Sequence, residues 1–151
     1  MSKIIENIFY KQREDFYRKY KNRNKRFTFP EDITMTKGIP YATDGMNIGD
    51  PSGTAPAEGW PVIINIHGGG LLLGSKEFNQ YFCARLCTLG YLVFNVEYRL
   101  IPDCTIYDQI SDIFQAMDFI QKKLDRYRGN SADVYAVGDS GGGVALVFCH
   151  G

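Results

Sequence analysis

The sequence predicts an α/β fold of three layers, with helices on both faces of a mostly parallel sheet. Apolar runs at residues 62–66, 91–96 and 134–137 are typical of buried parallel strands. Segments with helical periodicity, at residues 76–89 and 106–124, separate these runs. This alternation of strand and helix, joined by right-handed crossovers, produces a parallel sheet.

The first third of the chain has weaker signals. Residues 4–23 are predicted to form a helix with an aromatic stripe. Residues 33–36 and 39–42 are typical of short strands, and Asp44-Gly45 is a turn signal. Residues 49–61, which are rich in Gly, Pro, Ser and Ala, are predicted to form a loop.

The two predicted crossover helices each carry an apolar stripe. The first, closed by Gly90, is expected to bury Phe78, Phe82, Leu86 and Leu89. The second ends at Gly129-Asn130, and its stripe consists of Ile106, Ile110, Ile113, Met117, Ile120 and Leu124.

Two glycine-rich turns follow the first and third apolar runs. The first reads His67-Gly68-Gly69-Gly70, and the second reads Gly138-Asp139-Ser140-Gly141-Gly142-Gly143. Either turn alone is a weak signal, because glycine and serine are common in turns. Together, each at the end of a predicted strand, they indicate the oxyanion loop and the nucleophile elbow of a serine hydrolase.

The chemistry of such a site explains the glycines of the second turn. The nucleophile, Ser140, must sit on a sharp turn that exposes its hydroxyl, and side chains at Gly138 and Gly142 would clash with the strand or the following helix. The backbone N–H of Gly141, at the start of that helix, can donate to a developing oxyanion.

The first turn is expected to supply the other oxyanion donors. A run of glycines lets the backbone approach a substrate closely, and we assign the donors to Gly69 and Gly70. The loss of one such donor typically costs about 3–4 kcal/mol of transition-state stabilisation.

Three other interpretations of these turns are less consistent with the sequence. The turns could be ordinary surface β-turns, the second could be the serine motif of a chymotrypsin-like protease, or one could be a dinucleotide-binding loop. In the protease family a proline and a strand follow the motif, whereas here Gly143 precedes a helix-like apolar run. Neither turn has the G-x-G-x-x-G spacing with an acidic residue about 20 positions later.

The chain resembles the N-terminal half of α/β-hydrolases, in the branch of the hormone-sensitive-lipase-like and feruloyl/acetyl-esterase-like enzymes. The two glycine turns and Tyr98-Arg99-Leu100-Ile101-Pro102-Asp103 carry this resemblance, which spans residues 31–151. The last segment is similar to the family's Tyr-Arg-Leu-Ala-Pro-Glu, with substitutions at Ile101 and Asp103. The resemblance implies an esterase or lipase-like serine hydrolase with an oxyanion hole at Gly69, Gly70 and Gly141.

The resemblance also assigns structural roles within the turns. His67 and Gly68 would hold the glycine loop. Asp139 is adjacent to Ser140, so its side chain should project differently, and we expect it to accept a stabilising hydrogen bond in the elbow rather than act as the triad acid. His150 is ten residues from Ser140, about 15 Å along a helix, and is not expected to be the base.

The triad acid and histidine of this family follow the elbow, but the chain ends at Gly151. We therefore expect an α/β-hydrolase fragment that is truncated after its nucleophile elbow and inactive by itself. Carboxylic-ester hydrolysis through an acyl-serine intermediate is the expected parent reaction. The alternatives are a non-catalytic protein that binds carboxylates or acyl groups, and an inactive gene fragment.

The charge of the chain is uneven although its formal sum is zero. Residues 1–30 hold nine Lys or Arg against three Asp or Glu, so residues 31–151 carry an acidic excess. A basic arm that binds nucleic acid or an anionic membrane is one interpretation. We favour a helical cap segment at 1–30, laid over the acidic hydrolase portion at 31–151, with a small-molecule ester as the partner and no nucleic acid.

Composition predicts no cofactor and no metal site. The four cysteines lack a C-x-x-C pair, which favours free thiols in a reducing compartment. No signal peptide and no membrane span is apparent, so a cytoplasmic location is expected. The missing strands would leave a bare sheet edge, through which the chain could self-associate.

Overall fold

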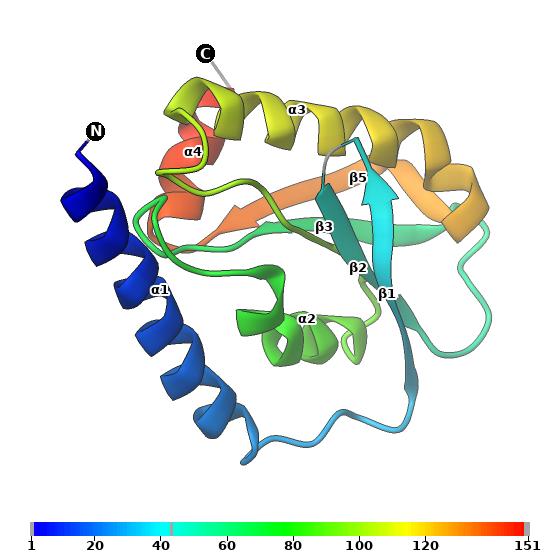
Figure 1. The fold of residues 1–151 in the computed structure, drawn as a ribbon. Helices are drawn as coiled ribbons and strands as arrows, with labels where there is room; N and C mark the ends of the chain where they lie inside the picture. Colours follow the sequence, from blue (N-terminus) through cyan, green and yellow to red (C-terminus); the bar gives the residue numbers. More distant parts are fainter. Residues whose placement is uncertain (1, 43, 150–151) are drawn as a thin grey trace.

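The computed structural model describes residues 2–42 and 44–149, which form a five-stranded sheet covered by helices (Figure 1). The strand order is β1-β2-β4-β3-β5. Strands β3 (Trp60–Ile66), β4 (Leu92–Val96) and β5 (Gly129–Gly138) are mutually parallel, whereas β2 (Asp44–Pro51) is antiparallel to β1 (Ile33–Tyr41) and β4. Among the described strands, β2 alone is therefore antiparallel to the rest, which confirms the predicted α/β fold with a mostly parallel sheet.

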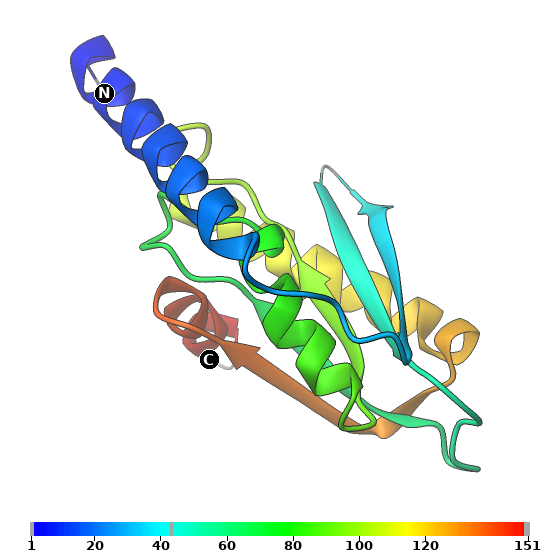
Figure 2. The ribbon, with the colours of Figure 1, turned by 90° about the horizontal axis from the view of Figure 1, so that it is seen from below.

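Helices cover both faces of the sheet. A 3₁₀ turn at Lys76–Phe78 leads into α2 (Gln80–Cys87) on one face, while α3 (Ile106–Lys123) and α4 (Gly141–Cys149) cover the other (Figure 1). A second 3₁₀ turn at Leu124–Tyr127 connects α3 to β5. The first helix, α1 (Lys3–Asn24), runs along the flank of the molecule, outside these layers (Figure 2).

Alternate side chains of the central strands fill two separate cores. On the α3 side, the main core contains Ile64, Ile66 and Phe94 together with Ile113 of α3. On the α2 side, a smaller core joins four buried residues, Ile63, Cys83, Cys87 and Val93. Strands buried on both faces read as continuous apolar runs, which explains why the sequence predicted β3 and β4 correctly.

Strand β2 corrects the prediction for residues 44–61. Asp44-Gly45 begins a strand rather than a turn, and the predicted loop from Gly49 loses its first residues to the same strand. β2 pairs with β4, and its residues 46–49 are buried, with Met46 and Ile48 in the main core. A Cβ atom at Gly49 would lie 2.4 Å from the Cys87 Sγ atom, so helix packing, not a turn, requires this glycine.

The predicted apolar face of the helix at 76–89 is wrong in part, although Leu86 does pack against the smaller core. The small residues Cys83, Ala84 and Cys87 face the sheet, whereas Phe82 and Leu89 are 52% and 65% exposed. Because α2 packs closely over β2 and β4, its contact face selects small side chains. Phe82 instead faces the groove described below.

An exposed apolar surface lies at the β5 edge of the described sheet. β5 is the last strand in the sheet order, and Val134 and Tyr135 on it are 42% and 54% exposed. In the adjoining α4, Val144 and Val147 are 50% and 72% exposed. An apolar edge strand with unpaired backbone groups is a template for association with another chain.

We therefore expect the purified 151-residue chain to self-associate through this surface. Sedimentation velocity at increasing concentration would measure the association. Lysine at both Val134 and Tyr135 should shift the distribution towards the monomer, because edge lysines oppose strand pairing. A wild-type chain that stays monodisperse and melts cooperatively as a monomer would contradict this expectation.

Candidate active site

The structure brings the two glycine turns together at the carboxyl ends of two adjacent strands. β3 and β5 are parallel neighbours, with Ile66 paired to Gly138. The Gly68 N–H donates to Asp139 Oδ1 at 3.0 Å, which links the two turns directly. A Cβ atom at Gly141 would lie 3.1 Å from the Gly70 nitrogen, so these two backbones are in close contact.

Ser140 lies on a sharp turn between β5 and α4. Its backbone φ is +49°, a left-handed conformation that a residue other than glycine rarely adopts. The turn is closed tightly: a Cβ atom at Gly138 would lie 2.5 Å from the Gly142 carbonyl carbon, and one at Gly142 would lie 2.2 Å from the Ile66 oxygen. Ser140 itself is exposed, so its hydroxyl is accessible to a substrate.

The first glycine turn leaves several backbone amides without an acceptor. Gly69 and Gly70 have φ values of +128° and +62°, and a Cβ atom at Gly69 would lie 2.1 Å from the Leu73 oxygen. Among the described residues, the N–H groups of Gly69, Gly70 and Gly141 donate to no protein acceptor. These three amides are therefore candidate donors to a ligand, and Gly70 and Gly141 are in close contact.

His67 is buried and turned towards the protein interior. Its Nε2 lies 2.8 Å from Glu97 Oε1 and its Nδ1 lies 2.9 Å from the Gly68 oxygen. The ring stacks on Tyr98 at a centroid distance of 4.4 Å, and the Tyr98 hydroxyl donates to the His67 oxygen. Both ring nitrogens are thus engaged, and His67 holds the start of the glycine loop in place.

Glu97 is the centre of the buried polar cluster under this loop. It accepts hydrogen bonds from His67 and from the Lys76 Nζ and backbone N–H. Burial alone would raise the pKa of Glu97, but the hydrogen bonds and charges of His67 and Lys76 outweigh it and hold the pKa below its ordinary value. Glu97 was not among the predicted site residues, although its place directly before the Tyr98-Arg99-Leu100 segment was a usable signal.

Replacement of Glu97 by glutamine should reveal this coupling in the pH dependence of stability. A lowered carboxyl pKa stabilises the folded state above the ordinary value of about 4.3, and this stabilisation is lost as the pH falls through the folded-state pKa. We expect E97Q to be less stable by about 2 kcal/mol at pH 7.

Chemical denaturation across pH 3–8 would measure this difference. The difference in the free energy of unfolding between E97Q and the wild type should disappear as the pH falls below about 4. The exposed substitution Glu14→Gln is the matched control and should leave the free energy of unfolding unchanged. A gap that is constant across this range would contradict the assignment.

Asp139 contacts two neighbours that stabilise the elbow. Its Oδ1 accepts from the Gly68 N–H and also from Asn79 Nδ2, at 2.8 Å. These bonds connect the elbow to the first glycine turn and to the start of α2. The contacts are those expected of an elbow-stabilising acceptor.

The segment after β4 fixes the far side of the glycine loop. Buried Gln109 of α3 donates to the Leu71 and Arg99 oxygens, both at 2.8 Å. The Arg99 guanidinium in turn forms a bidentate pair with buried Asp112. Neither polar contact was predicted, because helix periodicity marks apolar positions and not buried Gln or Asp.

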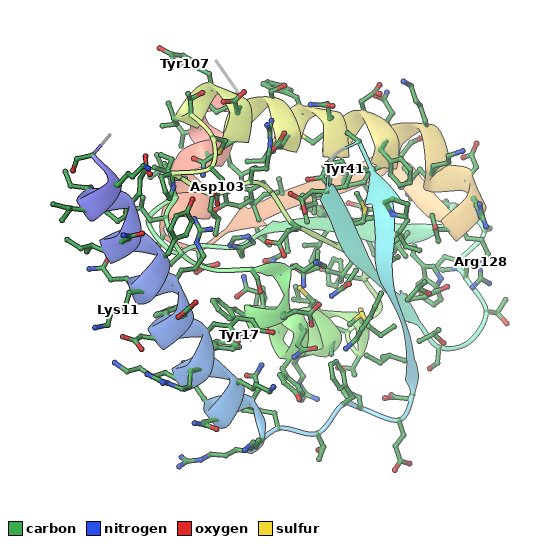
Figure 3. The ribbon with its side chains drawn as sticks, viewed as in Figure 1. Lys11, Tyr17, Tyr41, Asp103, Tyr107 and Arg128 are labelled. Carbon is green, nitrogen blue, oxygen red and sulfur yellow. The ribbon has the colours of Figure 1, made fainter. Side chains whose placement is uncertain are left out.

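Helix α1 is anchored to the same region. Arg13 donates to the Leu72 and Ile101 oxygens and pairs with Asp103 at 2.7 Å, and Tyr10 also donates to Asp103. In Figure 3, Asp103 lies beside α1 and Lys11 points away from the body. The predicted helix at 4–23 is confirmed. One of its faces contacts Leu72, which follows the glycine loop, and Ile101 and Asp103, which follow β4.

A groove separates α1 from α2 next to the two turns. Its volume is about 740 Å³, and its lining includes Gly68, Gly69 and Asp139 at the elbow. The remaining lining comes mainly from α1, the segment that follows it, and α2. A ligand in this groove would therefore lie beside the oxyanion loop.

The two cysteines of α2, Cys83 and Cys87, are not activated. Burial raises the pKa of Cys83 and raises that of Cys87 to about 12, so both remain protonated thiols. Within residues 2–42 and 44–149 no three His, Cys, Asp or Glu residues are placed to hold a metal ion. No helix in this part of the chain is long and apolar enough to cross a membrane.

Comparison with known proteins now places the chain in a family. The sequence profile of the BD-FAE family matches residues 46–149, which include both glycine turns and the segment after β4. The chain belongs to the BD-FAE family. The fold and the relatives described below identify it more broadly as an α/β-hydrolase.

Relatives and solved structures agree with this membership. An AB hydrolase superfamily protein of Schizosaccharomyces pombe is 35% identical over 125 residues, covering 80% of this chain and 36% of the relative. Rat neutral cholesterol ester hydrolase 1 is 36% identical over 88 residues, covering 54% of this chain and 21% of that enzyme.

A phosphonate-inhibited crystal structure of esterase B from Lactobacillus rhamnosis is similar over nearly the whole chain. It superposes with a TM-score of 0.84 at 27% identity, covering 96% of this chain and 48% of the esterase. The chain therefore spans about half the length of this solved structure and about a third of the yeast relative.

Proposed function

We propose that this chain carries the nucleophile and the oxyanion hole of a carboxylic-ester hydrolase that forms an acyl-serine at Ser140. The single observation that carries the proposal is the left-handed turn at Ser140, next to three backbone amides that have no acceptor among the described residues. Membership of a hydrolase family, and relatives named as esterases, support an ester as the substrate.

In the proposed reaction, Ser140 Oγ attacks the ester carbonyl carbon. The carbonyl oxygen becomes an oxyanion and accepts from the N–H groups of Gly69, Gly70 and Gly141. Collapse of this intermediate releases the alcohol, which takes the proton that Ser140 gave up, and water then hydrolyses the acyl-serine.

Proton transfer in this reaction needs a base near Ser140. His67 does not meet this need, because both of its ring nitrogens bind Glu97 and the Gly68 oxygen. We propose that the base and its acid partner lie outside residues 2–42 and 44–149. His150 also lies outside the described residues. Without the base, the 151-residue chain alone should hydrolyse p-nitrophenyl acetate no faster than its Ser140→Ala variant.

Residues 1–30 are proposed to act as a cap over the ester site. The Arg13 contacts attach α1 beside the glycine loop, and the groove between α1 and α2 opens at the elbow. A cap of this kind would bind the ester on one side while the body supplies the chemistry.

A second candidate function is a binding protein that holds a carboxylate or acyl group without turnover. The lack of a base facing Ser140 among the described residues favours this alternative. An inactive gene fragment is the third possibility.

A fluorophosphonate probe distinguishes these candidates, because it labels only an activated serine. The probe is added to the protein produced from its own gene in the cells that express it, and separately to the purified 151-residue chain. Mass spectrometry then locates the adduct. We expect an adduct on Ser140 in the protein made by the cells and none on the isolated chain. No adduct in either sample would support the non-catalytic alternatives, and an adduct in both would place the base within these 151 residues.

A further inference from the structure

The groove between α1 and α2 is lined by aromatic side chains along its length. Its aromatic lining consists of Phe16, Tyr20, Phe27, Phe78, Tyr81 and Phe82. Phe78 contacts Tyr20 of α1 at a ring-centroid distance of 4.0 Å, which joins the two walls near the elbow. Figure 3 shows Tyr17 on the side of α1 that faces α2. Such a lining suits an apolar or aromatic group of a small ligand.

Two arginines also line this groove, one from each wall. Arg23 is three residues after Tyr20 on α1, and Arg85 is four residues after Tyr81 on α2, so each lies one turn beyond a lining aromatic residue. Neither guanidinium forms an ion pair with a carboxylate in the part of the chain that the structure describes. The groove thus holds two positive charges that the fold itself does not neutralise.

The acidic residue of the lining lies at the elbow end. Asp139 is held there by the Gly68 N–H and Asn79. Arg85 is six residues after Asn79, which is about 9 Å along the axis of α2. Burial raises the pKa of Tyr20, the charge of Arg23 lowers it and the charge of Asp139 raises it, so Tyr20 is influenced by both charges of the lining. Along α2, the positive charge of Arg85 is therefore separated from the acidic residue at the elbow end.

We propose that this groove binds an apolar or aromatic group that ends in a carboxylate, with Arg23 and Arg85 as the counter-charges. Arginine donates to a carboxylate through paired N–H groups and rejects a cationic ligand. The anionic end would lie at the arginines and the apolar part against the aromatic walls, pointing towards the glycine loop. If the ligand is a substrate, the groove would favour esters that also carry a free carboxylate, and this part of the inference rests on the proposed function. The binding of a carboxylate ligand does not depend on that function.

Isothermal titration calorimetry with a matched pair of probes tests the proposal on the protein that cells produce from its gene. 4-Phenylbutyrate and its neutral amide, 4-phenylbutanamide, have the same apolar part and differ in charge. We expect the carboxylate to bind at least about tenfold more tightly than the amide. This preference should disappear in the double variant R23Q/R85Q, while the affinity for the amide stays the same.

The double variant R18Q/R26Q is the matched control, because it removes the same charge from residues outside the groove lining. It should retain the preference, and thermal melts should show that both variants fold. Equal binding of the two probes, binding of neither, or an equal loss in the control would overturn the proposal. A Ser140→Ala variant should bind as the wild type does. Absence of ester hydrolysis would therefore not contradict carboxylate binding in the groove. Absence of carboxylate binding would likewise not contradict hydrolysis at Ser140.

Discussion

Replacement of Ser140 by alanine should lower kcat for p-nitrophenyl acetate by at least about a thousandfold in the protein that cells produce from its gene. The Ser140 hydroxyl is the atom that would bond to the acyl carbon, and no other side chain of the elbow can take its place. The exposed substitution Ser131→Ala is the matched control and should leave the rate unchanged.

The same substitution should leave stability nearly unchanged. Ser140 is exposed, and its side chain makes no hydrogen bond among the described residues. Removal of its hydroxyl therefore neither opens a cavity nor leaves a buried partner unpaired. A folded S140A protein that hydrolyses the ester at the wild-type rate would contradict the assignment of the nucleophile.

Replacement of Gly142 by alanine should destabilise the fold by about 3 kcal/mol. The new Cβ atom would lie 2.2 Å from the Ile66 oxygen and 2.7 Å from the His67 oxygen. Both are backbone atoms at the end of β3, so they cannot move aside as a flexible side chain would. At an open helical position the same change would stabilise by roughly 1 kcal/mol, so the sign of the effect reports the close approach of α4 to β3.

Urea denaturation measures this effect, with Gly45→Ala as the control. A Cβ atom at Gly45 would meet its nearest atom, the Ile39 oxygen, at 3.4 Å, an ordinary contact. The control should therefore lose much less stability than G142A. An unchanged or raised free energy of unfolding for G142A would show that the turn is looser than these distances indicate.

The parts of the fold that the sequence predicted are those where local chemistry dictates the structure. Continuous apolar runs gave β3 and β4, and the glycines of the elbow gave the left-handed turn at Ser140. A continuous apolar run is typical of a strand buried on both faces. A cluster of glycines is typical of a close backbone approach.

The parts that the sequence did not predict depend on tertiary contacts. Residues 46–49 form a buried strand because β4 pairs with them and α2 packs above them, although Asp44-Gly45 before them is a turn signal and the segment from Gly49 is typical of a loop. Glu97 and Gln109 likewise support the glycine loop through contacts with residues distant in sequence. No periodicity in the chain marks such buried polar partners.

Detection of the acyl-serine tests most directly whether Ser140 is the nucleophile. The protein from cells is mixed with excess p-nitrophenyl acetate, quenched in acid within the first turnovers, digested and analysed by mass spectrometry. We expect one acetyl group on the peptide that contains Ser140, and none in S140A or in the isolated 151-residue chain. Ester hydrolysis with no acetyl group on that peptide, or with acetylation of another residue that persists in S140A, would contradict this assignment.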